Sequence, residues 1–131
     1  MVAAALAASG CAAVVPVGSE EAAFVAAGAQ RVPDAARAEL LVGNRLEGDG
    51  FTVAYRRDGT KRVRTDGGVV VDRRWWVRDD GTFCEELAAS GAPVCGGAGK
   101  LYVKDGRYRA FRPDGSAAPL SFTIAAGTGG D

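Results

Sequence analysis

Histidine is absent from this 131-residue chain. It is the commonest general base at neutral pH and the commonest metal ligand, so serine–histidine and cysteine–histidine nucleophile systems are excluded within the chain. An excess of one charge is also lacking, because 16 basic and 16 acidic side chains give a net charge of zero. The sequence therefore gives no global electrostatic bias toward nucleic acid or an acidic membrane, and we expect no specific nucleic-acid partner.

Cysteine is scarce, with only Cys11, Cys84 and Cys95. The last two bracket a short loop, and in an oxidising compartment a disulfide that closes such a loop stabilises the fold by roughly 3 kcal/mol. The alternative is a pair of buried free thiols. Without histidine or a CxxC pair, two cysteines do not make a tetrahedral metal site. We therefore expect a Cys84–Cys95 disulfide, no metal and no other cofactor.

Long apolar runs are also missing, since the apolar residues 1–15 fall short of the roughly 20 that a membrane-spanning helix needs. The run contains Ala7-Ala8-Ser9-Gly10-Cys11, which resembles the lipobox of bacterial lipoprotein signal peptides. The resemblance implies cleavage before Cys11, acylation of Cys11 and anchoring in the periplasm or cell envelope. Unlike an ordinary export signal, the run has no Lys or Arg before it. The alternatives are a plain Ala-rich signal peptide and a disordered tail in which Cys11 is incidental.

The chain divides by composition. Residues 1–11 form the signal-like segment, and residues 12–33, rich in Ala, Gly, Val and Pro without a sustained period, predict a flexible tether. A short helix is expected from Asp34, a fair N-cap, to Val42. The predicted β domain spans 34–126, and residues 127–131 are expected to form a disordered tail.

From residue 45 onward, short alternating segments are separated by six Asp-Gly dipeptides. Asp-Gly suits type I′ hairpin turns because both residues tolerate positive φ. The pattern predicts a mainly β fold of about eight antiparallel strands, closed or curled into a small lipocalin-like barrel, with a two-sheet sandwich as the alternative. The expected strands lie near 45–48, 51–57, 60–65, 69–78, 82–88, 99–104, 107–112 and 119–125.

The longest expected strand, 69–78, organises the domain. It places four apolar side chains on one face, those of Val69, Val71, Trp75 and Val77. Trp75 is expected to be a core residue. Arg73 interrupts the apolar face, which predicts a bulge or bend near Asp72 and Arg73.

Several turn and core residues together resemble a family of small exported alphaproteobacterial proteins of unknown function. The shared features are a Gly-Asn-x-Leu start, a tyrosine before an Asp-Gly-Thr turn, a tryptophan six residues before glycine, and two cysteines; here they are Gly43, Asn44, Leu46, Tyr55, Asp58, Gly59, Thr60, Trp75, Gly81, Cys84 and Cys95. The resemblance extends to about Ile124. It implies a lipocalin-like or curled β-barrel domain in the envelope, without assigned catalysis.

Basic residues concentrate between positions 56 and 78, where eight Lys and Arg against three Asp give 8 − 3 = +5. A cationic face could bind polyanions, anionic lipid head groups or an acidic protein. The alternative is a solvated sheet face balanced by cross-strand pairs with Asp79, Asp80, Glu85 and Glu86. The candidate binding surface comprises Arg62, Arg64, Arg74, Trp76 and Arg78.

These patterns favour a non-enzymatic envelope lipoprotein whose domain binds a partner. One alternative is a periplasmic inhibitor that inserts loop 64–68 or 85–98 into a hydrolase, and another is a carrier of a small apolar ligand. A carboxylate-based hydrolase is disfavoured, because neighbouring residues on a strand point to opposite faces and neither acidic couplet forms a facing pair. We assign no catalytic residue.

Overall fold

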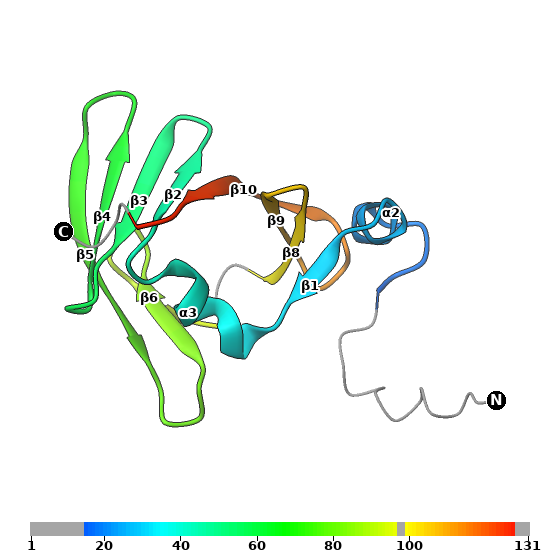
Figure 1. The fold of residues 1–131 in the computed structure, drawn as a ribbon, viewed down its shortest axis with the longest axis horizontal. Helices are drawn as coiled ribbons and strands as arrows, with labels where there is room; N and C mark the ends of the chain where they lie inside the picture. The colour runs from blue at the N-terminus through cyan, green and yellow to red at the C-terminus, as the bar shows by residue number, and fades with distance from the viewer. Residues whose placement is uncertain (1–14, 97–98, 128–131) are drawn as a thin grey trace.

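The fold is a mainly β, ten-stranded antiparallel sheet that curls into a half-barrel, with short helices at its N-terminal end (Figure 1). The structure is a computed structural model and describes residues 15–96 and 99–127. The helices are α2 (Glu20–Ala26), a 3₁₀ turn η2 (Asp34–Ala36) and α3 (Arg37–Leu41). The strands are β1 (Gln30–Val32), β2 (Arg45–Gly48), β3 (Phe51–Tyr55), β4 (Thr60–Thr65), β5 (Val70–Val77), β6 (Phe83–Glu86), β7 (Pro93–Cys95), β8 (Lys100–Lys104), β9 (Arg107–Phe111) and β10 (Ala117–Ala125).

The strand order is β1-β8-β9-β10-β2-β3-β4-β5-β6-β7, so the predicted curled β fold is confirmed as one sheet. All eight expected strands are present, and β1 and β7 are additional. These two are the terminal strands of the sheet, which therefore curls without closing. In Figure 1, α3 lies between the β6 side and the β1 side of the curl.

The two faces of the sheet bury different apolar clusters, as period-two alternation requires. The inner face carries the main core, which includes Leu46, Val53 and Phe122, and Leu41 of α3 packs into it. The outer face carries a smaller cluster of Ala29, Tyr102 and Phe111, against which Phe24 of α2 packs. The helices thus cover opposite faces of one sheet.

Residues 15–33 correct the tether prediction over the part of it that the structure describes. Ser19 caps α2 by accepting a hydrogen bond from the N–H of Ala22 at 3.0 Å, and β1 pairs with β8. Glu21 of α2 is fully buried. This segment has no periodic pattern because it is short and its partners lie far away in the sequence. The domain accordingly begins before residue 34.

The prediction allowed a bulge or a bend near Asp72 and Arg73, and the β4–β5 pair contains no bulge there. The pairing of β5 with β4 runs unbroken from Thr60↔Arg74 to Arg64↔Val70. Arg73 stays on the inner face because its guanidinium finds acceptors there: Nη2 donates to the carbonyl of Ala88 at 2.9 Å. Val69 and Val77, expected on the inner face, are exposed at the turns that end the strand.

The Asp-Gly dipeptides lie in turns, but most of these turns are not of type I′. Both φ values are positive only at Asp105-Gly106, at 51° and 79°. In the other five dipeptides the aspartate keeps a negative φ. Three of these aspartates instead accept a hydrogen bond from the N–H two residues later, the Asx-turn arrangement, at Asp58, Asp80 and Asp114.

A disulfide joins Cys84 to Cys95, confirming the predicted pairing. The two cysteines are directly opposed partners in the β6–β7 pair. Cys11 lies outside the described residues. Within those residues, no helix is long and apolar enough to cross a membrane.

Candidate functional site

A polar cluster lies on the mainly apolar inner face of the half-barrel. It consists of Tyr55 at the end of β3, Lys61 opposite it on β4, and Glu85 on β6. Glu85 Oε1 accepts hydrogen bonds from the Tyr55 hydroxyl at 2.7 Å and from Lys61 Nζ at 2.8 Å. Tyr55 and Lys61 are almost fully buried. Alternation alone places all three inside, because each occupies an inward position of its strand.

Arg37, the first residue of α3, extends into the same interior and is 6% exposed. Its Nη2 donates to the carbonyl of Gly99 at 2.9 Å, and its Nη1 donates to that of Gly96 at 3.4 Å. The Asp34 carboxylate lies 3.7 Å from Nη2 and is itself largely exposed. Arg37 Nε is buried and has no hydrogen-bond partner among the described residues.

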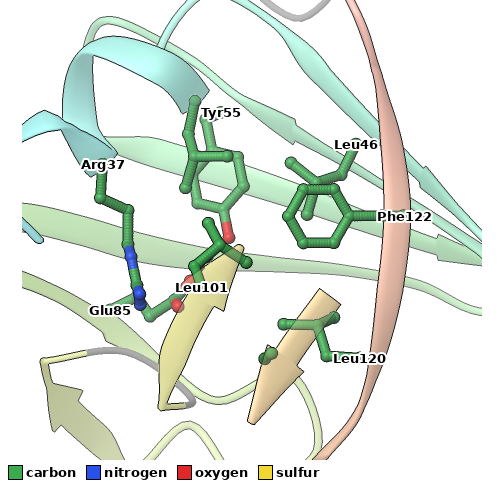
Figure 2. A pocket seen from close by; sticks show the side chains of 9 residues that line it. Arg37, Leu46, Tyr55, Glu85, Leu101, Leu120 and Phe122 are labelled. Carbon is green, nitrogen blue, oxygen red and sulfur yellow. Dashed lines mark hydrogen bonds between the residues drawn. The ribbon is translucent and has the colours of Figure 1, made fainter. Parts of the chain in front are cut away.

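Three of these residues, Arg37, Tyr55 and Glu85, border a cavity of about 40 Å³ (Figure 2). Such a volume has room for more than one water molecule but not for a drug-sized ligand. Polar groups line one side and apolar side chains the rest. The lining residues are Arg37, Leu41, Leu46, Tyr55, Glu85, Leu101, Ala110, Leu120 and Phe122.

Burial controls the protonation of the cluster. The pKa of Tyr55 is raised well above its usual value, first because the phenol is buried and second because the Glu85 carboxylate faces it. The pKa of Arg37 is lowered because burial removes the guanidinium from water, although Asp34 and Glu85 oppose that effect. Tyr55 is therefore held as a neutral hydrogen-bond donor.

The cavity lining contains a single carboxylate. Glu85 is the one carboxylate among the residues that line the cavity, so no carboxylate pair faces a common substrate position there. Among the described residues, no group of three or more His, Cys, Asp or Glu side chains could hold a metal ion.

The predicted basic surface lies on the outer face, where β4 and β5 present Arg62, Arg64, Arg74 and Trp76. Acidic side chains pair with two of these three arginines. Arg62 donates twice to Asp72, at 2.7 and 2.8 Å, and Arg74 pairs with Glu86 at 3.2 Å.

Arg78 follows the end of β5 and adjoins two further acids, Asp79 and Asp80. The four arginines of the predicted surface and the four acids beside them, Asp72, Asp79, Asp80 and Glu86, give 4 − 4 = 0. Arg64 pairs with Val70 at the start of β5, whereas Arg78 follows its last residue, so the predicted residues are spread along the strand and their charge is balanced by acids.

Trp75 is a core residue, as predicted. Its Nε1 donates to the carbonyl of Arg56 at 2.8 Å, and its ring stacks on Phe83 with centroids 5.9 Å apart. Glu85 and Glu86 point to opposite faces, also as predicted, since Glu85 contacts Lys61 inside and Glu86 contacts Arg74 outside.

Sequence reasoning missed the inner cluster. One signal was available: Lys61 shares an inward register with Val63, and a lysine among inward apolar residues indicates a buried charge with a partner. No local signal identifies Arg37, because the carbonyls it binds lie about 60 residues later, at separations of 59 and 62.

A second buried cluster lies on the outer face, beneath α2. Glu21 Oε1 accepts from Lys100 Nζ at 2.6 Å, and Glu21 Oε2 accepts from the Tyr102 hydroxyl. Burial and the Glu21 carboxylate raise the pKa of Tyr102 to about 12. The adjacent Glu20 accepts from the N–H of Ala117 at 2.8 Å. Together these contacts attach α2 to the sheet.

Comparison of the chain with protein-family models, with curated proteins and with solved structures gives no match. The functional argument therefore depends on the residues themselves.

Proposed function

We propose that this chain is an exported, non-catalytic binding protein of the bacterial envelope, attached to a membrane by lipid on Cys11, which acts through contact with a partner. The observation that carries the proposal is the filled interior. The half-barrel encloses only about 40 Å³ beside a packed core, too little for a bulky apolar ligand. Contact of the protein surface with a partner therefore explains the function better than carriage of a bulky ligand does.

Export is supported by the disulfide and by the lipobox-like segment. A disulfide between directly opposed cysteines, Cys84 and Cys95, persists in oxidising compartments and is rare in a reducing cytosol. The resemblance to small exported alphaproteobacterial proteins favours the same placement.

A second candidate function is inhibition of a periplasmic hydrolase by an inserted hairpin. The specific observation in its favour is the apolar tip between β4 and β5, where Val69 and Val70 are 56% and 46% exposed beside Gly67 and Gly68. Exposed apolar side chains on a projecting turn are a common means of contact with a protein partner. The β6–β7 loop, with Leu87 exposed, is the other expected inserting element.

Mass spectrometry of the protein purified from membranes tests the anchor. The expected result is a mature chain that begins at Cys11 and carries acyl chains. An unmodified Cys11 within an intact N-terminus would remove the lipoprotein proposal.

Titration of the protein with a fluorescent fatty acid tests whether it acts by carrying a ligand. We expect no saturable binding, because the interior is filled. One-to-one binding would instead favour ligand carriage.

Site-specific photo-crosslinking in cells tests the tip. A photoreactive residue at Val69 should give a discrete protein adduct, whereas one at Val25, an exposed valine on α2, should not. Equal labelling from both positions would contradict a role for the tip.

A further inference from the structure

We propose that an open groove between the β3–β4 turn and β5 binds a neutral carbohydrate, with a sugar ring stacked on the indole of Trp76. The groove lies where β4 ends at Thr60 and β5 continues beyond it, and its volume is about 380 Å³. The lining residues are Asp58, Gly59, Arg74, Trp75 and Trp76. This inference goes beyond contact with a protein partner, and it holds whether or not Cys11 carries lipid.

The first step concerns an aromatic ring that is kept out of the core. All ten aromatic residues lie in the described part of the chain, and nine of them belong to, or pack against, one of the two apolar clusters. Trp76 is the exception. It is half-buried, and none of the described residues places a ring or a cation over its indole or accepts a hydrogen bond from its Nε1. The groove therefore contains a large apolar surface that the fold itself does not use.

The second step concerns the acceptor beside this ring. Asp58 is exposed, and Thr60 donates both its backbone N–H and its hydroxyl to Oδ1 of Asp58, at 3.0 and 2.6 Å. These hydrogen bonds hold the pKa of the Asp58 carboxyl below its usual range, so the carboxylate is charged. Because both bonds go to Oδ1, the other oxygen can accept a hydrogen bond from a ligand.

The third step concerns the donor. The Arg74 side chain is 74% exposed, and Glu86 engages its Nε and Nη2, each at 3.2 Å. A guanidinium carries five N–H donors, so Nη1 remains to donate to a ligand. The groove thus presents an acceptor, a donor and an aromatic face together.

The fourth step concerns the charge of the ligand. Each charged group of the groove already has an opposite charge nearby, since Glu86 pairs with Arg74 and Arg56 acts on Asp58. An anion would be repelled by Asp58 and a cation by Arg74. An apolar ligand would take both groups out of water without replacing their hydrogen bonds. A sugar hydroxyl both donates and accepts, and the C–H face of a sugar ring is attracted to the negative face of an indole, so a neutral sugar suits all three groups.

NMR titration of the full-length, oxidised, ¹⁵N-labelled protein tests the proposal. The probes are cellotriose and chitotriose, neutral β-linked trimers of glucose and of N-acetylglucosamine. The chain contains two tryptophans and so gives two indole N–H signals. The Trp76 signal should shift and saturate with at least one trimer, with a Kd on the order of 1 mM. The Trp75 signal should shift less, because its Nε1 donates to the carbonyl of Arg56.

Other small molecules test the class of ligand. Sorbitol, a polyol without a ring, should bind about tenfold more weakly than the trimer, because it has no flat face to stack on the indole. Neither choline chloride nor sodium phosphate should compete. Competition by choline would assign the groove to a cation that binds the ring, and competition by phosphate would assign it to an anion. Either result would overturn the proposal.

Matched variants locate the site. Trp76→Ala should raise the Kd of the trimer by about tenfold. Asp58→Asn, which keeps an acceptor for Thr60, provides a second test if Trp76→Ala does not fold, and it should raise the Kd by about fivefold through loss of a charged acceptor. Asp114→Asn is its control: Asp114 accepts from the N–H and the hydroxyl of Ser116 in the same way, at 2.9 and 2.6 Å, but does not line the groove. The control variant should bind as the native protein does.

Two further results would overturn the proposal. One is equal binding of the trimer by the native protein and all three variants. The other is no saturable binding of either trimer at concentrations far above the expected Kd. Both leave the mass-spectrometric test of the lipid anchor unaffected, so failure of the sugar site is distinguishable from failure of the proposed function.

Discussion

The molecule contains two buried Lys–Glu–Tyr clusters on opposite faces of one sheet, and they differ in how completely they are closed. On the outer face, Lys100 and Tyr102 each bond a separate oxygen of Glu21, which is fully buried. On the inner face, Lys61 and Tyr55 both bond the same oxygen of Glu85, beside a cavity.

The difference shows how the same residue types can serve two purposes. In the outer cluster, Lys100 and Tyr102 of the sheet both bond Glu21 of α2. These bonds attach α2 to the sheet, so the cluster is structural. In the inner cluster, Tyr55 and Glu85 line the cavity, so water can reach this cluster. Position relative to the cavity, and not composition, separates the two.

The largest effect is expected from removing the two glutamates in turn. Glu21→Ala removes the carboxylate that Lys100 and Tyr102 bond in a nearly closed site. This loss should lower the free energy of unfolding by about 3 kcal/mol. Glu85→Ala should cost less, about 1–2 kcal/mol, because Glu85 lines the cavity and water there can replace its oxygen as a hydrogen-bond partner. Urea unfolding of both variants measures the difference. A larger loss of unfolding free energy for Glu85→Ala than for Glu21→Ala would contradict the comparison.

The disulfide beside the inner cluster should have the next effect. Cys84 precedes Glu85 directly, and the crosslink closes a loop with a sequence separation of 11. Replacing both cysteines by alanine should lower stability by about 2–3 kcal/mol, mostly through the unfolded state. Urea unfolding with and without reductant provides the measurement. The native protein should approach the double variant once reduced, and an unchanged midpoint would contradict this.

Alkaline pH should act on the tyrosines of both clusters. The folded pKa of Tyr102, about 12, exceeds its ordinary value of 10, because the neutral phenol is the buried form. The stability that this group contributes is therefore complete below pH 10 and lost as pH rises toward 12. Tyr102→Phe should reduce the steepness of that loss, as measured by urea unfolding between pH 9 and 12. An identical slope in the variant would contradict the assignment.

The smallest effect is expected from an exposed pair of the predicted basic surface. Arg62 and Asp72 bond each other on the outer face in contact with water, so their interaction is screened. Arg62→Gln should leave the urea midpoint within experimental error, in contrast to Glu21→Ala. A loss comparable with that of Glu21→Ala would show that burial does not decide the ranking.

Much of the sheet could be predicted from the sequence because its contacts are local. Between residues 45 and 86, successive strands pair with their neighbours, and Asp-Gly dipeptides mark several of the turns between them. Period-two alternation then fixes which side chains face inward. The Cys84–Cys95 pair follows from the short loop that it closes.

The remainder depends on remote contacts that no local pattern encodes. Glu21 meets Lys100 across 79 residues, and β1 pairs with β8, so a segment that resembles a tether is ordered by partners far along the chain. The same reason hides the inner site, where Arg37 is positioned by carbonyls beyond β7. The sequence predicts an irregularity at Arg73 because the carbonyls of Leu87 and Ala88 that accept from it lie in another segment of the chain.

The most direct test of the claim that the inner cluster is open and the outer one closed is NMR measurement of the exchange of two tyrosine hydroxyl protons with water. The Tyr55 hydroxyl, which lies beside the cavity, should exchange faster than the Tyr102 hydroxyl, which bonds the fully buried Glu21. Equal exchange at both tyrosines, or faster exchange at Tyr102, would contradict the claim.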